Sequence, residues 1–81
     1  TTLMIYSREG IYHTTETLTR FQQRINSSNF IQVSRHAVIN IDHLESLSDS
    51  FSGNMTAKLT NQIKTEVSRR YVKLLMEYLG I

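Results

Sequence analysis

Three consecutive polar residues, Ser34, Arg35 and His36, lie between two apolar stretches near the middle of the chain. The flanking runs 30–33 and 37–44 are rich in β-branched residues, which favours two strands joined by a polar turn. Such a turn would hold a guanidinium and an imidazole at the end of rigid backbone, where they could donate hydrogen bonds to a phosphate or a base edge. The alternative is an ordinary solvated connection, because loops are generally polar and exposed.

A second group of cationic side chains lies near the C-terminus. Four cations against one carboxylate give residues 63–73 a net charge of +3, while the rest of the chain nets −1. The four cations are Lys64, Arg69, Arg70 and Lys73. Ser68 is in a position to cap a helix that begins at residue 69, so the last three cations would surround the amino end of that helix, where anions are favoured. A phosphate site is one interpretation of this group, and a solvated helix cap is the other.

The first half of the chain is expected to form a hairpin and then a short helix. Residues 2–6 and 11–14 have strand composition and are separated by turn-forming residues. Thr14 or Thr15 is expected to cap a helix over residues 16–25. The apolar residues that recur there at helical spacing are Leu18, Phe21 and Ile25.

The second half is expected to contain an extended edge and a hairpin. Residues 44–50 continue the chain in extended form as far as a turn at residues 51–54, which contain a Gly-Asn pair. Residues 55–60 and 63–67 alternate apolar with polar side chains, as strands with one buried face do. A tight two-residue turn is expected between them, at residues 61–62.

The C-terminal segment predicts a helix near residues 69–79 that ends at Gly80. Its expected apolar stripe consists of Tyr71, Leu74, Leu75 and Tyr78, broadened by Val72 and Leu79. The fold class expected for the whole chain is therefore mainly β, with antiparallel strands and hairpins, a short helix near residues 16–25 and a C-terminal helix near residues 69–79.

Length and composition limit the classes of function. The chain has 81 residues, a formal net charge of +2 and no cysteine, which predicts one domain without disulfides or thiolate metal sites. Its longest apolar runs fall short of the roughly 20 residues that a membrane span needs, so a cytoplasmic domain without membrane contact is expected. No activated nucleophile is visible, and His36, Asp42 and His43 lack metal-ligand spacing. We therefore expect neither an enzyme nor a bound cofactor or metal.

Two segments taken together resemble the LytTR-type DNA-binding domain found at the C-terminus of many bacterial response regulators. The first carries Phe30, Arg35, Val38, Ile39 and Asn40, and the second is the run Glu66-Val67-Ser68-Arg69-Arg70-Tyr71. Thr17-Leu18 also matches the start of the short helix in that family. The resemblance extends over nearly all of the chain.

The resemblance implies a LytTR-like β fold that grips double-stranded DNA through loops and strand ends entering successive major grooves. It assigns Arg35 to the base-contacting position of the middle loop and Arg70 to that of the last loop. Arg69 and Lys73, which share a helix face, are expected to bind the phosphate backbone on either side. The full set of expected DNA-binding residues is Ser34, Arg35, His36, Asn40, Arg69, Arg70 and Lys73.

The chain departs from the family pattern around the middle loop. Gln32 replaces an arginine, Ser34 replaces the usual histidine and His36 replaces the usual serine. These changes alter the hydrogen-bonding groups around Arg35 and hence the expected base preference. The opening strands of the family and its first DNA-contacting loop would precede Thr1, so residues 1–81 are expected to form a single, N-terminally incomplete domain.

The function expected from these observations is sequence-specific binding of double-stranded DNA by the output domain of a bacterial transcriptional regulator. Promoter sites with repeats are the expected targets, and a homodimer is compatible with such sites. The alternative is a protein-interaction module without nucleic acid. An RNA-binding module would usually expose aromatic side chains for stacking, whereas Phe21, Phe30 and Tyr71 lie in buried-type patterns.

Overall fold

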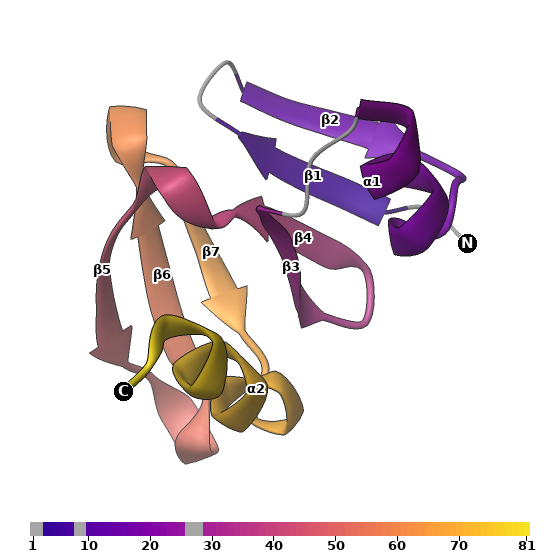
Figure 1. The fold of residues 1–81 in the computed structure, drawn as a ribbon. Coiled ribbons are helices and arrows are strands. Elements are labelled where there is room, and N and C mark those ends of the chain that lie inside the picture. The colour runs from indigo at the N-terminus through magenta and orange to yellow at the C-terminus, as the bar shows by residue number, and fades with distance from the viewer. Residues whose placement is uncertain (1–2, 8–9, 26–28) are drawn as a thin grey trace.

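The computed structural model describes residues 3–7, 10–25 and 29–81, which form two β-sheets and two α-helices (Figure 1). The strands of the first sheet are β1 (Leu3–Ser7), β2 (Gly10–Thr14), β3 (Phe30–Ser34) and β4 (Ala37–Asn40). Those of the second are β5 (Leu44–Asp49), β6 (Met55–Leu59) and β7 (Lys64–Val67). The helices are α1 (Leu18–Ile25) and α2 (Arg69–Leu79). The expected mainly β fold with a short helix and a C-terminal helix is confirmed.

The first sheet has the strand order β2-β1-β4-β3. Strands β1 and β2 form the expected antiparallel hairpin, and β3 pairs antiparallel with β4. The central pair β1 and β4 is parallel, which the expectation of antiparallel strands did not include. This pairing joins strands that are distant in the sequence, so no turn residue could indicate it. It makes the β3–β4 hairpin a part of the same sheet as the N-terminal hairpin.

The second sheet is an antiparallel meander with the order β5-β6-β7, as the alternating pattern predicted. The connections to and within this sheet differ from the expected ones. The expected two-residue turn at 61–62 is wrong, because a short 3-10 helix over Thr60–Gln62 joins β6 to β7. The expected strand over 37–44 also ends early, at Asn40, because a 3-10 helix over Ile41–His43 separates β4 from β5. Asp42 and His43 therefore do not lie on a strand.

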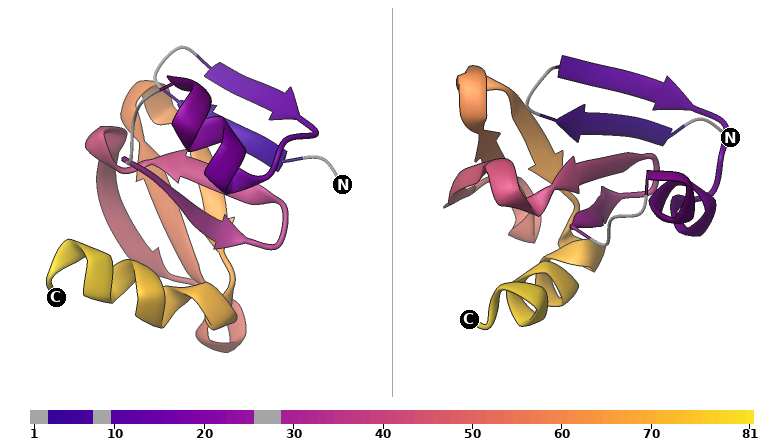
Figure 2. Two further views of the ribbon diagram at one scale, coloured as in Figure 1. Left: turned by 45° about the vertical axis from the view of Figure 1, so that its right-hand side comes forward. Right: turned by 45° about the horizontal axis from the view of Figure 1, so that its top comes forward.

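Two apolar clusters lie on opposite faces of the first sheet. The larger is formed by both sheets and α2, and its buried residues are Ile31, Val33, Ala37, Ile39, Ala57, Leu59, Val67 and Leu75. The smaller lies under α1 and consists of Leu3, Ile5, Phe21 and Val38. Figure 2 shows α1 and α2 on opposite sides of the molecule. The β3–β4 hairpin is thus fixed by packing on both faces, which makes its turn a rigid platform.

The two helices form as expected, except for the start of α1 and the buried face of α2. The helix α1 begins at Leu18 rather than residue 16, because Thr17 Oγ1 accepts the Arg20 backbone N–H at 3.2 Å. On α2, Leu75 is buried and faces the larger cluster with Tyr71, Val72 and Leu79, whereas Leu74 and Tyr78 are 55% and 49% exposed. The buried stripe is therefore rotated from the expected one. Within the described residues, no helix is both long and apolar enough to cross a membrane.

Candidate nucleic-acid interface

The turn between β3 and β4 carries the central polar residues as expected. Ser34 pairs with Ala37, which leaves Arg35 and His36 as the two turn residues, and both are exposed. Gln32 Nε2 donates to the Arg35 carbonyl oxygen at 3.0 Å and so braces the turn from the strand that leads into it. The predicted arrangement of strand, polar turn and strand is confirmed.

The second basic segment reaches the same edge of the molecule through one backbone contact. The Ser68 N–H donates to the Val33 carbonyl oxygen at 2.8 Å, which ties the residue before α2 to the end of β3. Tyr71 N–H then donates to the Ser68 carbonyl at 2.7 Å as the helix begins. Two segments that are far apart in the sequence are thereby joined beside the β3–β4 turn.

Between them lies a cavity of about 470 Å³, which we call the Arg35–Arg70 cavity; it is lined by Arg35, Ser68, Arg70 and Tyr71. Both arginines are exposed, and neither guanidinium has an ion-pair partner among the described residues. No carboxylate contributes to the lining. The cavity therefore presents two uncompensated positive charges and two hydroxyl-bearing side chains to an external anion.

Arg69 and Lys73 do not line this cavity. A Cβ at Gly53 would lie 2.9 Å from Arg69 Cδ, which shows that the Arg69 side chain passes over the turn between β5 and β6. Lys73 is exposed and shares its helix face with Arg69, four residues before it. Arg70, on a different face, lines the cavity with Arg35. Arg70 was expected to have a different role from Arg69 and Lys73, and of these three residues it alone lines the cavity.

The start of α2 is capped by a residue that the sequence did not indicate. Ser68 occupies the N-cap position, yet its side chain makes no capping hydrogen bond in the described part of the chain. Asn54 Oδ1 accepts the Arg69 N–H at 2.8 Å instead, and Asn54 Nδ2 donates to Glu66 Oε1 at 3.3 Å. The only signal at Asn54 was its place in an expected turn, so its contact with the helix could not be predicted from local spacing.

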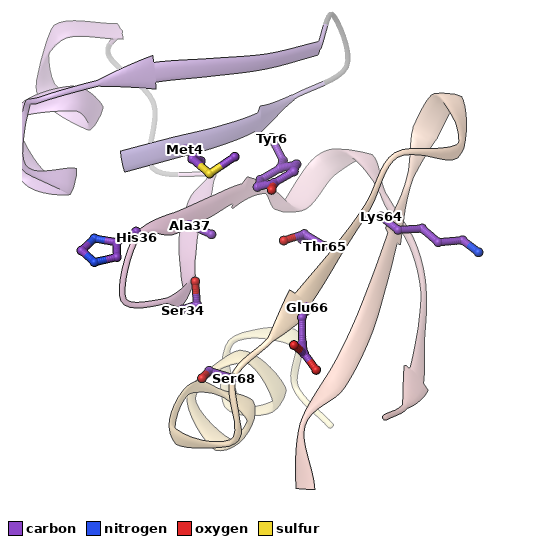
Figure 3. Close-up of a pocket in the computed structure, with 9 residues that line it drawn as sticks. All are labelled: Met4, Tyr6, Ser34, His36, Ala37, Lys64, Thr65, Glu66 and Ser68. Carbon is purple, nitrogen blue, oxygen red and sulfur yellow. The ribbon is translucent and has the colours of Figure 1, made fainter. Parts of the chain in front are cut away.

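Ser34 and His36 line a second cavity, of about 430 Å³. Figure 3 shows Met4 and Tyr6 of β1 over one side of it and Thr65 and Glu66 of β7 on another, with the His36 ring at the outer end, directed away from β7. Ser68 borders both cavities. The turn residues are therefore divided between two hollows, with Arg35 alone beside Arg70.

Asn40 is separated from the other expected site residues by the length of β4. Its Oδ1 accepts the Asp42 backbone N–H at 3.0 Å and caps the 3-10 helix that follows. Asp42 Oδ2 in turn accepts a hydrogen bond from Asn29 Nδ2 at 2.7 Å. Asn40 therefore stabilises the start of this 3-10 helix, at the end of β4 that is far from Arg35.

The sequence profile of the LytTr DNA-binding domain family matches residues 1–80. The chain belongs to this family. The LytTr match agrees with the resemblance carried by the Arg35 and Arg70 segments, and it makes DNA the partner of this domain. It also favours DNA over the alternative of a protein-interaction module without nucleic acid.

Named relatives of this LytTr domain are regulatory proteins. The sensory transduction protein LytR of Staphylococcus epidermidis is 34% identical over 70 residues, which are 86% of this chain and 28% of that protein. The transcriptional regulatory protein LytR of Staphylococcus aureus (strain N315) is 31% identical over 77 residues, which are 95% of this chain and 31% of that protein. The chain thus spans less than a third of the length of either relative.

A solved structure shares the fold. It is the LytTr DNA-binding domain of a Bacillus cereus protein described as a methyl-accepting/DNA response regulator, with a TM-score of 0.72 and 19% identity. The likeness covers 90% of this chain and 67% of that one. The LytTR-like β fold implied by the sequence is therefore confirmed.

Proposed function

We propose that this LytTr domain binds promoter DNA sequence-specifically through the surface around the Arg35–Arg70 cavity. The observation that carries the proposal is the pair of exposed guanidiniums, from two distant segments, that line one cavity without a carboxylate. Positive charge of this kind attracts the phosphate backbone, and side chains on rigid backbone can read base edges. The family supports DNA as the ligand.

Within this surface we assign base reading to Arg35 and a groove contact to Arg70. Arg35 projects from a braced turn, and a planar guanidinium held in this way matches O6 and N7 of guanine. Arg69 and Lys73, on the neighbouring helix face, are assigned to backbone phosphates. Ser34 and His36 lie on either side of Arg35 in the chain and are assigned to the rim of the contact. Asn40 Oδ1 caps the 3-10 helix at the far end of β4, and the expected DNA contact of Asn40 remains a prediction.

The proposal is tested by replacing Arg35 with alanine. A binding site is first selected from a random duplex library, and affinity for this site and for a scrambled duplex is then measured by fluorescence anisotropy at fixed salt. Arg35→Ala is expected to cost about 1–3 kcal/mol more on the selected site than on the scrambled one. Arg20→Ala removes the same charge from the exposed face of α1 and is expected to leave the difference between the two duplexes unchanged. Equal losses on both duplexes for Arg35→Ala would contradict base reading.

The parent protein is proposed to be a cytoplasmic bacterial transcriptional regulator in which this domain is the output module. The names of the two staphylococcal relatives, a sensory transduction protein and a transcriptional regulatory protein, support this assignment. Repeated promoter sites and a homodimer are part of the proposal, and the half-exposed apolar side chains Leu74 and Tyr78 on the outer face of α2 are compatible with self-association. Sedimentation on duplexes with one or two copies of the selected site tests it. Binding of one domain to a two-copy duplex at saturation would contradict it.

A further inference from the structure

The Arg35–Arg70 cavity combines positive charge with neutral hydrogen-bonding residues. Two like charges line one concave site, and the other two lining residues, Ser68 and Tyr71, carry hydroxyl groups, which can donate as well as accept. Both backbone segments are fixed, because Gln32 braces the turn and the Ser68 N–H bonds to Val33. Cationic and hydroxyl-bearing side chains that extend from fixed backbone around one hollow are suited to binding an oxoanion.

The shape of the site narrows the choice of oxoanion. DNA presents concave grooves, which accept protruding side chains, and a convex sugar-phosphate backbone, which fits a concave protein surface. Arg35 on its turn and Arg70 at the start of α2 are exposed on either side of the hollow. Each guanidinium has five N–H donors, and a bidentate contact with a base uses two of them, so donors remain for the anion between them.

We propose that the Arg35–Arg70 cavity binds a single phosphodiester of the DNA strand, which receives hydrogen bonds from both guanidiniums and from the Ser68 hydroxyl. This inference rests on the proposed DNA-binding function and makes it more specific. The two arginines then act as one unit on a shared anionic group and not as independent contacts in separate places. Arg69 and Lys73, whose surroundings differ, bind other phosphates.

The experiment replaces phosphates one at a time. Duplexes of the selected site are made with one neutral methylphosphonate linkage at each position in turn, and the affinity of the wild-type chain is measured for each. Loss of a charge-assisted contact of this kind is expected to weaken binding about ten-fold at one position. At that position the same replacement is expected to weaken binding only about three-fold in Arg35→Ala and in Arg70→Ala alike, because each variant has lost one of the two guanidiniums that share the phosphate. Arg20→Ala and Lys73→Ala are the controls and should retain the full sensitivity there.

Two further variants separate charge from geometry. Arg35→Lys and Arg70→Lys keep the positive charge but lose the planar fork, so each should retain part of the sensitivity at the shared position. Circular dichroism of every variant without DNA verifies that its fold is intact. Specific DNA binding in which Arg35→Ala and Arg70→Ala reduce the sensitivity at two different phosphates, or at none, would overturn the shared site alone. Failure of the wild-type chain to prefer its selected duplex would instead overturn the proposed function.

Discussion

The capping of α2 by Asn54 leads to a prediction that runs against the local sequence. Helix N-caps are normally found at the residue before the first helical one, which here is Ser68, a residue type well suited to the task. The side chain that accepts the Arg69 N–H is nevertheless that of Asn54, from the turn between β5 and β6. Asn54→Ala is therefore expected to destabilise the domain, and Ser68→Ala is expected to be nearly neutral.

The expected loss of stability in Asn54→Ala follows from the two hydrogen bonds that the Asn54 side chain makes. The contact from Arg69 N to Asn54 Oδ1 is short, at 2.8 Å, and loss of such a cap costs about 1 kcal/mol. The contact with Glu66 Oε1 is longer, at 3.3 Å, and exposed, so it adds only a few tenths of a kcal/mol or so. We expect a total loss of about 1–1.5 kcal/mol, which in a domain of this size lowers Tm by roughly 4–12 °C.

The assay is urea denaturation followed by circular dichroism, with thermal unfolding as a second measurement. Asn54→Asp is the informative companion variant, because a carboxylate oxygen can still accept the Arg69 N–H but is repelled by Glu66. The double variant Asn54→Asp with Glu66→Gln removes that repulsion and should regain the stability of the wild-type chain or exceed it. All four variants leave the buried clusters unchanged, so the denaturant dependence of unfolding should stay constant.

The reasoning fails if the two alanine variants behave in the opposite way. A loss of more than about 1 kcal/mol in Ser68→Ala with no change in Asn54→Ala would return the cap to the local residue. Equal small losses in both variants would show that the N-terminus of α2 is stabilised by solvent alone.

Three further outcomes follow from single contacts. Gly53→Ala should destabilise the fold by about 1 kcal/mol or more, because φ is +85° at this residue and the new Cβ would lie 2.9 Å from Arg69 Cδ. Urea denaturation measures this loss, and an unchanged midpoint of unfolding would refute it. The hydrogen bond from Arg24 lowers the pKa of Glu16. The contribution of this ion pair to the stability of the fold is therefore present at neutral pH and is lost as pH falls through the folded-state pKa of Glu16. Carbon-detected NMR titration should show the Glu16 pKa rising toward its ordinary value in Arg24→Gln, and no movement would contradict the assignment. Lys73→Ala should weaken binding to selected and scrambled DNA alike, and it should reduce the slope of log K against log salt by about 0.9. An unchanged slope would show that Lys73 does not bind a phosphate.

The sequence by itself determined the local elements of this protein. β-branched runs on either side of Ser34-Arg35-His36 predicted the β3–β4 hairpin, and alternating residues predicted β6 and β7. Gly80, with φ of +78°, ends α2 as expected. These features depend on side-chain shape, backbone freedom and spacing within a few residues, all of which a linear pattern contains.

Tertiary structure alone decided how those elements meet. Parallel pairing of β1 with β4 and the Ser68 contact with Val33 join segments that no local signal connects, and the second of these puts Arg35 and Arg70 around one cavity. The same holds for α2, whose apolar residues extend too far around the helix to define one buried face. Packing against the two sheets selects the face that contains Leu75 and leaves Leu74 exposed. Contacts of this kind depend on the positions of neighbouring elements in space, and those positions are fixed only when the whole core assembles.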